Sequence, residues 1–335
     1  MGRQSLYKYQ KEHFAKLTLK REVYKRLLDL AHSEGLSAND FIAKVLEFLD
    51  SVDIADIVLE GANSYDSRAT IPIPYFGGDY YIKNQLLEIL YSTGCSTLVE
   101  VFGGGGVITQ FADRRVFNVI VYNDIDNLVV NFFTVLRDRP KELMRKLIIM
   151  PVSRAFYFEV LDLLRSGKIN ELDPVTKAAY YFYAVRTSFN GGLGRGVSVS
   201  PTVPTARKFA GAVKQLGEYA KRWVGVFIEN RDFRELIPLY DRTTTVFYLD
   251  PPYIREKSRY YAHTFSTKDL KDLLQILDRI KGKFLLKIAQ DHMRFKFFSN
   301  WVGKYNVRTL EKPLHSYKSI GNSKPTLKLL LVSNY

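Results

Sequence analysis

The sequence predicts an α/β protein in which a sheet-forming region is preceded by a short, basic N-terminal module. From Ile71 onward, apolar runs typical of strands alternate with amphipathic runs typical of helices. Two of the strand-like runs end in residues suited to ligand binding: four glycines follow one run, and an acid with two prolines follows another. We therefore expect residues 71–335 to form the domain that carries the site, and residues 51–70 to be a linker.

The N-terminal residues 1–50 show the pattern of a strand followed by two helices. Residues 14–20 alternate between apolar and polar side chains, as a half-buried strand does. An apolar stripe with helical spacing follows and ends at Gly35, a residue type that commonly ends helices. Ser37, with Asp40 three residues later, is typical of the start of a second helix.

A glycine-rich turn follows the first predicted strand of the sheet. Glycines 103–106 let the backbone approach a ligand closely, and the next helix offers free N–H groups to an anion. The turn lacks the Lys-Ser/Thr pair of a phosphate-binding loop. A second predicted strand, 117–122, leads to Asp124, placed where such folds hold a ribose through its hydroxyls. The alternative is that Asp124 caps the helix that begins near Leu128.

Asp250-Pro251-Pro252-Tyr253 comes directly after the apolar run 246–249. Two prolines stop the strand and stiffen the turn, because proline has a fixed φ and no N–H. One carboxylate, free carbonyls and one ring are then held at the carboxyl end of a strand, where ligands bind in open α/β sheets. This group fits a flat ring that bears an amino group. The alternative is an ordinary capped strand followed by a proline turn.

The composition narrows the class of protein. The chain has 335 residues, 46% of them hydrophobic and 25% charged, as in soluble globular proteins. No apolar run approaches membrane-spanning length and the N-terminus lacks a signal-peptide core, so we expect a cytoplasmic protein. One cysteine and five scattered histidines predict no disulfide framework and no metal. The net charge of +14 favours a polyanionic partner.

Several motifs follow one another in a fixed order over about 70–335. They are Tyr75-Phe76-Gly77-Gly78, Glu100-Val101-Phe102-Gly103-Gly104-Gly105, Asn123-Asp124, Arg186-Thr187-Ser188-Phe189-Asn190-Gly191, Asp232-Phe233, Asp250-Pro251-Pro252-Tyr253 and Leu331-Val332-Ser333-Asn334-Tyr335. In this order they resemble the Dam-type family of adenine-N6 DNA methyltransferases. The resemblance implies a Rossmann-like methyltransferase sheet that uses S-adenosyl-L-methionine, with a mostly helical target-recognition region inserted at about 140–225.

The resemblance also implies a role for each matched residue. The cofactor would be bound by Tyr75, Phe76, Gly77, Gly78, Glu100, Phe102, Gly103, Gly105, Asp124 and Asp232. The target adenine would be bound by the catalytic turn, in which Asp250 and the Pro251 carbonyl accept from the N6 amine, Pro252 stiffens the backbone and Tyr253 stacks on the flipped base. Within the insertion, DNA would be contacted by Arg186, Asn190 and Arg195.

One position departs from the family's pattern. The family often has a lysine directly after the first Gly-Gly pair, near the cofactor, whereas this chain has Asp79. Lys83 lies one helical turn later and could substitute, so we include it among the cofactor-binding residues. If neither residue serves, the affinity for the cofactor is weakened.

The order of strand, helix, glycine, serine and helix in residues 1–50 resembles the ribbon-helix-helix family of DNA-binding proteins. In that family two chains pair their strands and lay the ribbon in the major groove. The resemblance implies that the chain forms a homodimer through this module and contacts DNA through Lys16, Thr18 and Lys20. The alternative is a helical hairpin packed on the catalytic domain.

Three functions are compatible with these motifs. The favoured one is a site-specific methyltransferase that acts on the N6 amine of a flipped adenine in double-stranded DNA. A second is a methyltransferase that acts on cytosine N4 or on a base amine in RNA, since these amines present the same donors. A third is a non-catalytic DNA-binding regulator that has kept the fold; Asp79 is its only support in the sequence, and the intact turn 250–253 argues against it.

Overall fold

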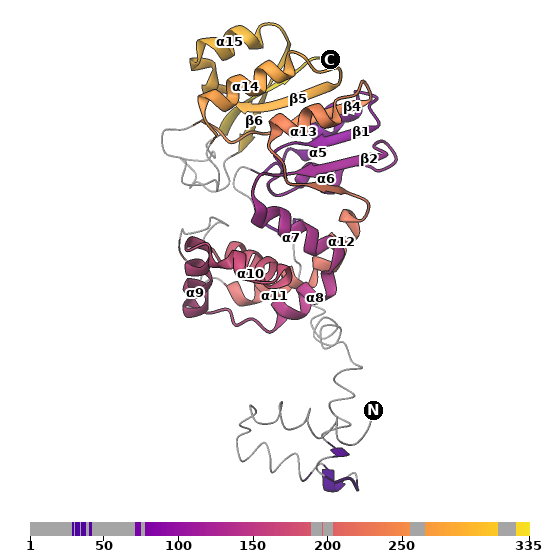
Figure 1. Cartoon of the computed structure of the whole chain (residues 1–335), viewed down its shortest axis with the longest axis vertical. Coiled ribbons are helices and arrows are strands. Elements are labelled where there is room, and N and C mark those ends of the chain that lie inside the picture. Colours follow the sequence, from indigo (N-terminus) through magenta and orange to yellow (C-terminus); the bar gives the residue numbers. More distant parts are fainter. Residues whose placement is uncertain are drawn as a thin grey trace. The chain divides into compact units, whose positions relative to one another are not determined.

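The structure of the chain is a computed structural model that falls into two compact units, Met1–Asn63 and Ser64–Tyr335. We describe each unit by itself (Figure 1). The residues that the structure describes are 71–74, 78–188, 196, 204–254, 265–313 and 326–335, together with positions 29, 31–33, 35–37, 40 and 41.

In the first unit, the structure describes the turn between the two predicted helices. Gly35 has a φ of 67°, and the Leu36 N–H donates to the Ala31 carbonyl at 2.9 Å, as at a helix end closed by glycine. The Ser37 hydroxyl accepts from the Asp40 N–H at 3.2 Å and donates to the Asp40 carboxylate at 2.6 Å. The predicted end of one helix and start of the next are therefore confirmed.

The predicted strand over 14–20 lies outside the described residues. The same holds for Lys16, Thr18 and Lys20, the residues expected to face DNA. The ribbon-helix-helix interpretation, and the homodimer that it implies, stay predictions.

The second unit is built on a seven-stranded sheet with the order β3-β2-β1-β4-β5-β7-β6. All neighbouring strands from β3 to β5 are parallel, and β7 is antiparallel to both β5 and β6. The strands are β1 (Thr97–Glu100), β2 (Val119–Asn123), β3 (Phe227–Glu229), β4 (Thr245–Leu249), β5 (Lys283–Ala289), β6 (Asn306–Pro313) and β7 (Thr326–Ser333). This order confirms the predicted Rossmann-like α/β fold, and its reversal between β1 and β4 creates the crevice in which such sheets bind ligands.

Helices lie between successive strands from β1 to β6. Helices α13, α14 and α15 cover one face, where their leucines and aromatic side chains form a core with β1, β4 and β5. The inner strands are nearly continuous apolar runs, as parallel strands buried on both faces must be, and every residue of β4 is buried. The helices associated with the sheet are α5 (Lys83–Tyr91), α6 (Val107–Phe111), α7 (Asn127–Asp138), α13 (Phe233–Tyr240), α14 (Thr267–Leu277), η3 (Gln290–Arg294) and α15 (Lys296–Val302).

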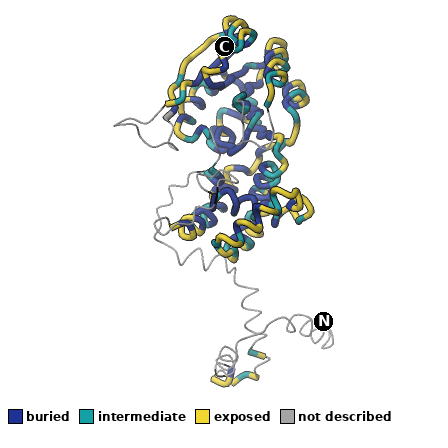
Figure 2. Tube along the Cα trace, turned by 90° about the vertical axis from the view of Figure 1, so that its left-hand side faces the viewer, coloured by how far each residue is buried: buried dark blue, intermediate teal, exposed yellow. Residues whose placement is uncertain are grey.

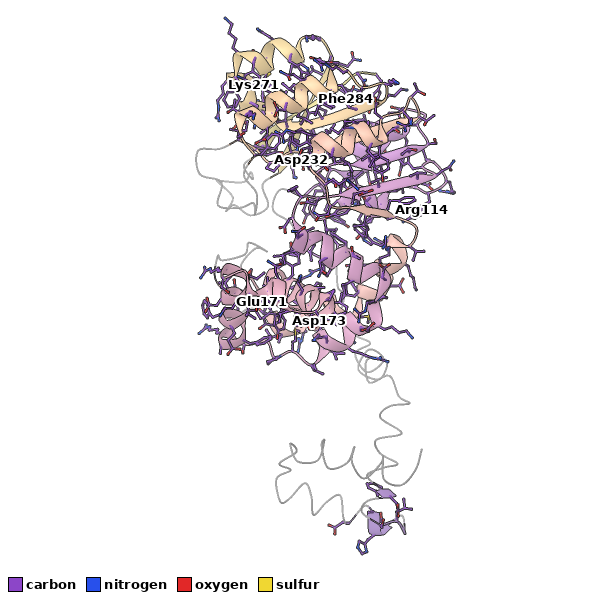
Figure 3. All side chains as sticks on the ribbon, in the orientation of Figure 1. Arg114, Glu171, Asp173, Asp232, Lys271 and Phe284 are labelled. Carbon is purple, nitrogen blue, oxygen red and sulfur yellow. The ribbon has the colours of Figure 1, made fainter. Side chains whose placement is uncertain are left out.

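The chain between α7 and β3 forms a helical region with its own buried interior (Figure 2). Its central helix α10 packs against α7, α8 and α9, and Asp173 caps its first turn by accepting from two backbone N–H groups at 3.0 Å (Figure 3). The helices are α8 (Pro140–Ile148), α9 (Arg154–Arg165), η1 (Lys168–Glu171), α10 (Pro174–Thr187), α11 (Thr205–Lys214) and α12 (Leu216–Trp223). The predicted insertion at about 140–225 is therefore mostly helical, and its role in reading DNA stays a prediction.

The residues that the structure describes show neither a membrane-spanning helix nor a cluster of metal-ligating side chains. No helix among them is long and apolar enough to cross a membrane. Within the same residues, no three His, Cys, Asp or Glu side chains gather as metal ligands would.

Candidate active site

The reversal in strand order brings the glycine turn and the proline turn to the same edge of the sheet. Strands β1 and β4 are parallel neighbours, with Glu100 opposite Tyr248. The Val101 N–H then donates to the Tyr248 carbonyl at 3.0 Å. The residues that follow each strand, glycines 103–106 and the turn 250–253, consequently leave the sheet side by side.

The glycine turn is held against the end of β2 by hydrogen bonds. The Gly103 N–H donates to the Asn123 carbonyl at 2.7 Å, and the Gly104 N–H donates to the Asp124 carboxylate at 2.7 Å. The Tyr122 hydroxyl donates to the Gly104 carbonyl at 2.8 Å. A side chain at Gly103 would overlap the ring of Tyr122, so the close packing of these two segments requires glycine there.

Asp124 is not the cap of the following helix. The cap of α7 is Asp126, which accepts from the Leu128 N–H at 2.9 Å. The alternative, in which Asp124 caps the helix that begins near Leu128, is therefore wrong. Its carboxylate accepts from the N–H groups of Gly104 and Asp126, which orients it beside the glycine turn where a ribose hydroxyl is expected.

Glu100 points into the protein below the glycine turn. Its carboxyl group is buried and accepts from the N–H groups of Ile108 and Thr109 at 3.3 and 2.8 Å, in the first turn of α6. Burial raises the pKa of Glu100 to about 8, because the charged form loses its hydration. At neutral pH the group is therefore mostly protonated, and its hydrogen bonds fix the start of α6.

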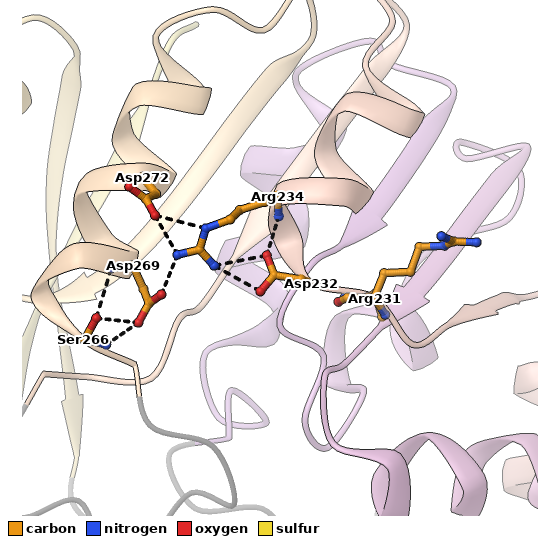
Figure 4. A network of polar contacts seen from close by, with 7 residues as sticks. Arg231, Asp232, Arg234, Ser266, Asp269 and Asp272 are labelled. Atoms are coloured by element: carbon orange, nitrogen blue, oxygen red, sulfur yellow. Dashed lines mark hydrogen bonds and ion pairs between the residues drawn. The ribbon is translucent and has the colours of Figure 1, made fainter.

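Asp232 lies at the start of α13, near the carboxyl end of the sheet (Figures 3 and 4). Its carboxylate accepts from the Arg234 N–H at 2.8 Å and from the Arg234 guanidinium at 3.0 Å. The same guanidinium reaches Asp269 and Asp272 on α14 at 2.5 and 2.8 Å. Arg234 thus ties the turn that carries Asp232 to the first turns of α14.

Three aromatic rings gather beside Asp232. Phe102 lies 5.7 Å from Phe233 and 5.8 Å from Phe265 between ring centroids, and the last two are 6.1 Å apart. The rings come from the glycine turn, from the residue after Asp232 and from the segment that leads into α14. Such a cluster offers an apolar wall of the kind that a purine ring packs against. Of these three rings, the sequence analysis assigned Phe102 to the cofactor and named Phe233 only as part of a motif.

Asp79 is buried among cations and a tyrosine, an environment that the sequence did not indicate. The Tyr248 hydroxyl and the Lys287 ammonium both donate to its carboxylate, and Lys312 lies 3.3 Å from it. Lys312 also donates to the Gly78 carbonyl at 2.8 Å. Burial opposes the charge on Asp79, but Lys287 and Lys312 hold its pKa below the usual range.

Lys83, which the sequence analysis includes among the cofactor-binding residues, lies beside two aromatic rings. Its ammonium lies 4.0 Å from the centre of the Tyr80 ring and 5.0 Å from that of Phe111, and it donates to the Tyr80 carbonyl at 3.3 Å. The cations that meet Asp79 are Lys287 and Lys312, which our sequence interpretation did not name for the site. The sequence feature that could have identified Lys287 is its position inside the apolar run of β5.

Asp250 connects to the same cations. Its carboxylate oxygen Oδ2 lies 2.7 Å from the Lys287 ammonium. Within the part of the chain that the structure describes, no hydrogen bond reaches the other oxygen, Oδ1. Burial raises the pKa of Asp250 to about 6, although the charge of Lys287 acts in the opposite direction. The carboxylate is therefore mostly ionised at neutral pH.

A buried histidine supports the turn that follows Asp250. The Ile254 N–H donates to Nε2 of His292 at 3.1 Å, which places the imidazole proton on Nδ1, close to the Ala289 carbonyl. The Tyr253 ring packs edge-on against the same imidazole, with ring centroids 5.8 Å apart. Burial lowers the pKa of His292, so the neutral form that accepts from Ile254 is favoured. In the sequence His292 is one of five scattered histidines, and nothing in its neighbourhood indicates this role.

Arg186 is turned inward rather than displayed to a partner. Its guanidinium donates to the carbonyls of Ile71 and Pro72 at 2.5 and 2.7 Å, and burial lowers its pKa to about 10. Arg186 therefore joins residues 71–72 to α10, and its contact with DNA stays a prediction. The remaining predicted site residues, Tyr75, Phe76, Gly77, Asn190 and Arg195, lie outside the described residues.

A doubly wound sheet with a glycine turn and an Asp-Pro-Pro-Tyr turn at its switch point defines a Rossmann-like methyltransferase. The model of the D12 class N6 adenine-specific DNA methyltransferase family matches residues 75–313 of this chain, and the chain belongs to that family. It is therefore a site-specific, adenine-specific DNA methyltransferase.

Individual proteins are also similar. The type II methyltransferase M1.LlaDCHI of Lactococcus lactis subsp. cremoris is 27% identical over 223 residues, which are 61% of this chain and 76% of that protein. Among solved structures, the precorrin 8w decarboxylase of Methanobacterium thermoautotrophicum matches with a TM-score of 0.31 and 10% identity, over 75% of this chain and 89% of that one. The methyltransferase domain of bacterial CtHen1 matches with a TM-score of 0.29 and 10% identity, over 75% and 96%.

Proposed function

We propose that the protein moves a methyl group from S-adenosyl-L-methionine to the N6 amine of an adenine that has left the stack of double-stranded DNA. The observation that carries the proposal is Asp250, whose carboxylate stands at the carboxyl end of β4 with Oδ2 fixed by Lys287. A carboxylate oxygen and a proline carbonyl, held on a stiff turn beside a tyrosine, suit an aromatic amine.

The residues around the glycine turn fit the proposed cofactor. The Phe102, Phe233 and Phe265 rings would pack against its adenine, Asp232 would accept from the adenine amine and Asp124 would accept from the ribose hydroxyls. S-Adenosyl-L-methionine, when bound, supplies a methyl group on a positively charged sulfur. The nearby Gly103 and Gly105 let the backbone approach this ligand closely.

The turn 250–253 would prepare the amine to accept the methyl group. An exocyclic adenine amine is a poor nucleophile, because its lone pair is delocalised into the ring. Asp250 and the Pro251 carbonyl would hold the two N–H groups and draw the nitrogen toward a tetrahedral geometry, so that the lone pair points at the methyl carbon. The bound cofactor would supply the methyl group to this lone pair, and the Asp250 carboxylate would accept the extra N6 proton and pass it to water.

The charge distribution on the helical region supports DNA as the partner. Arg207 and Lys208 on α11 and Lys221 and Arg222 on α12 are exposed, and the whole chain carries a net charge of +14. Exposed cations of this kind bind the phosphate backbone without reading its sequence. We therefore expect binding that weakens steeply as salt is raised.

Transfer of a labelled methyl group from S-adenosyl-L-methionine to unmethylated duplex DNA, followed by nucleoside analysis, tests the proposal. Label in N6-methyladenine is the expected result. Label in cytosine, or label only in RNA, would instead support the second function considered above. A folded protein that labels no nucleic acid would support a regulatory role.

Replacing Tyr253 by alanine is expected to weaken productive binding of the target base. Stacking on an aromatic side chain contributes about 1–3 kcal/mol per base, so kcat/KM for DNA should fall by roughly 5- to 150-fold. Tyr253→Phe keeps the ring and should retain most of the activity. Steady-state kinetics on one duplex substrate measure both variants, and equal losses in the two would contradict stacking as the role of the ring.

A further inference from the structure

Four ionisable side chains form a row of alternating charge behind the catalytic turn. We call Asp250, Lys287, Asp79 and Lys312, in this order, the charge row. Lys287 lies 2.7 Å from Asp250 and donates to Asp79, and Lys312 lies 3.3 Å from Asp79. The residues come from the turn after β4, from β5, from the segment before α5 and from β6, so the row exists only in the folded sheet.

The row is buried everywhere except at its catalytic end. The side-chain exposure is 0% for Lys287, 5% for Asp79 and 10% for Lys312, but 23% for Asp250. Buried ion pairs are poor devices for stability alone, because each ion loses several kcal/mol of hydration and apolar residues of similar volume often stabilise as well. The single exposed end therefore indicates that the row serves Asp250 rather than the core.

We propose that Lys287 is a positioning residue for methyl transfer, which fixes Oδ2 of Asp250 and turns Oδ1 toward the target amine, while Asp79 offsets the charge of Lys287 so that Asp250 stays an effective anion. The inference rests on the proposed function of Asp250. A lysine alone beside Asp250 would hold the carboxylate in place but would also neutralise it. Asp79 removes this conflict, and Lys312 in turn keeps Asp79 ionised.

The titratable groups around the charge row leave its alternating charges in place. Tyr248 donates to Asp79 and, being buried beside carboxylates, has a pKa well above its usual range, so it stays a neutral donor. Glu100 is mostly protonated at neutral pH and adds little charge. Although burial opposes it, the two aspartates hold the pKa of Lys287 well above its usual range, so this residue stays a cation.

Two substitutions should move the pH dependence of transfer in opposite directions. Lys287→Met removes a positive neighbour of Asp250, so the carboxylate protonates at higher pH and the acid limb of the kcat–pH profile moves to higher pH. Asp79→Asn removes a negative neighbour of Asp250, so the acid limb of this profile moves to lower pH. Both variants should also lower kcat at pH 7 by about 10- to 100-fold, the first because Asp250 loses its orientation and the second because Lys287 now neutralises it.

The controls separate this role from a contribution to folding. Lys283→Met is the matched control, because Lys283 lies on the same strand and donates to the Thr93 carbonyl at 2.6 Å, away from Asp250. Asp79→Asn/Lys287→Met replaces the ion pair by a neutral pair, and we expect it to regain thermal stability over both single variants without regaining kcat. Recovery of kcat together with stability would show that the pair is only structural and would overturn the proposal.

A direct titration keeps the two proposals distinguishable. The carboxyl carbon of Asp250 can be followed by ¹³C NMR with selective labelling, assigned through Asp250→Asn. If the unchanged chain methylates adenine but Lys287→Met neither slows transfer nor shifts this titration, the inference fails and the proposed function stands. If the unchanged chain methylates nothing, the proposed function fails. Equal Asp250 titration curves in the unchanged chain, Lys287→Met and Asp79→Asn would also remove the electrostatic part of the inference.

Discussion

Asp250→Ala is expected to lower kcat for methyl transfer by about 100- to 1,000-fold, as loss of one positioned electrostatic partner does in other enzymes. The alanine removes the acceptor that orients the N6 amine and the negative charge that stabilises it as it becomes cationic. It also leaves Lys287 without its 2.7 Å partner, although Asp79 still holds that ammonium. The affinity for S-adenosyl-L-methionine should change little, because the predicted cofactor contacts lie on other segments.

Single-turnover methylation of a duplex substrate and calorimetric titration with the cofactor measure the two effects separately. Asp250→Asn keeps one acceptor oxygen and the shape of the side chain, so it should be less damaging than the alanine. Asp113→Ala is a suitable control, since Asp113 pairs with exposed Arg115 at the surface. If Asp250→Ala methylates at nearly the rate of the unchanged chain, Asp250 does not have the role given to it.

The parts of the fold that the sequence predicted are those with a local cause. The positive φ of Gly104 and Gly106 and the double proline after Asp250 act on the backbone of their own segment, so the turns at the ends of β1 and β4 could be predicted without knowing their neighbours. The cap at Gly35 and the helix start at Ser37 are local in the same sense. The pairing of β1 with β4 then brings the glycine turn and the catalytic turn to one edge of the sheet.

The parts that the sequence did not predict depend on contacts between distant residues. Lys287 and Asp79 are 208 positions apart, and nothing in either neighbourhood indicates that they meet. Arg186 was predicted to contact DNA because of its motif, whereas in the fold it reaches carbonyls 114 and 115 positions earlier. The role of a long charged side chain depends on the residues that pack around it, and these are known only from the tertiary structure.

Asp79 shows how this limit affected the functional interpretation. From the sequence, an acid in a position often held by lysine raised doubt about cofactor binding. In the fold, Lys287 and Lys312 surround the acid, so positive charge is present in this part of the site and comes from β5 and β6 instead of from the segment 78–79. The only sequence feature that favoured a regulator without activity therefore loses its force.

Gly103→Ala is expected to destabilise the protein by about 1–3 kcal/mol, the usual cost of overpacking a buried site. An alanine Cβ would stand 2.6 and 2.8 Å from ring atoms Cδ2 and Cζ of Tyr122. That ring cannot move aside easily, because it packs edge-on against Phe133 and Trp223 at 5.0 Å and its hydroxyl donates to Gly104. The strain falls on the glycine turn, so cofactor affinity should fall together with stability.

Denaturant unfolding and calorimetric cofactor titration of Gly103→Ala test both expectations. Gly217→Ala, in α12, is the matched control: among the described residues its Cβ would meet only the Met144 sulfur, at 3.9 Å, and alanine favours a helix by about 0.5–1 kcal/mol relative to glycine. Tyr122→Leu should relieve part of the overlap, so the double variant should be more stable than the sum of the single effects predicts. Strict additivity would mean that the ring of Tyr122 is not what excludes a side chain at this turn, and the close joining of the glycine turn to β2 would need another cause.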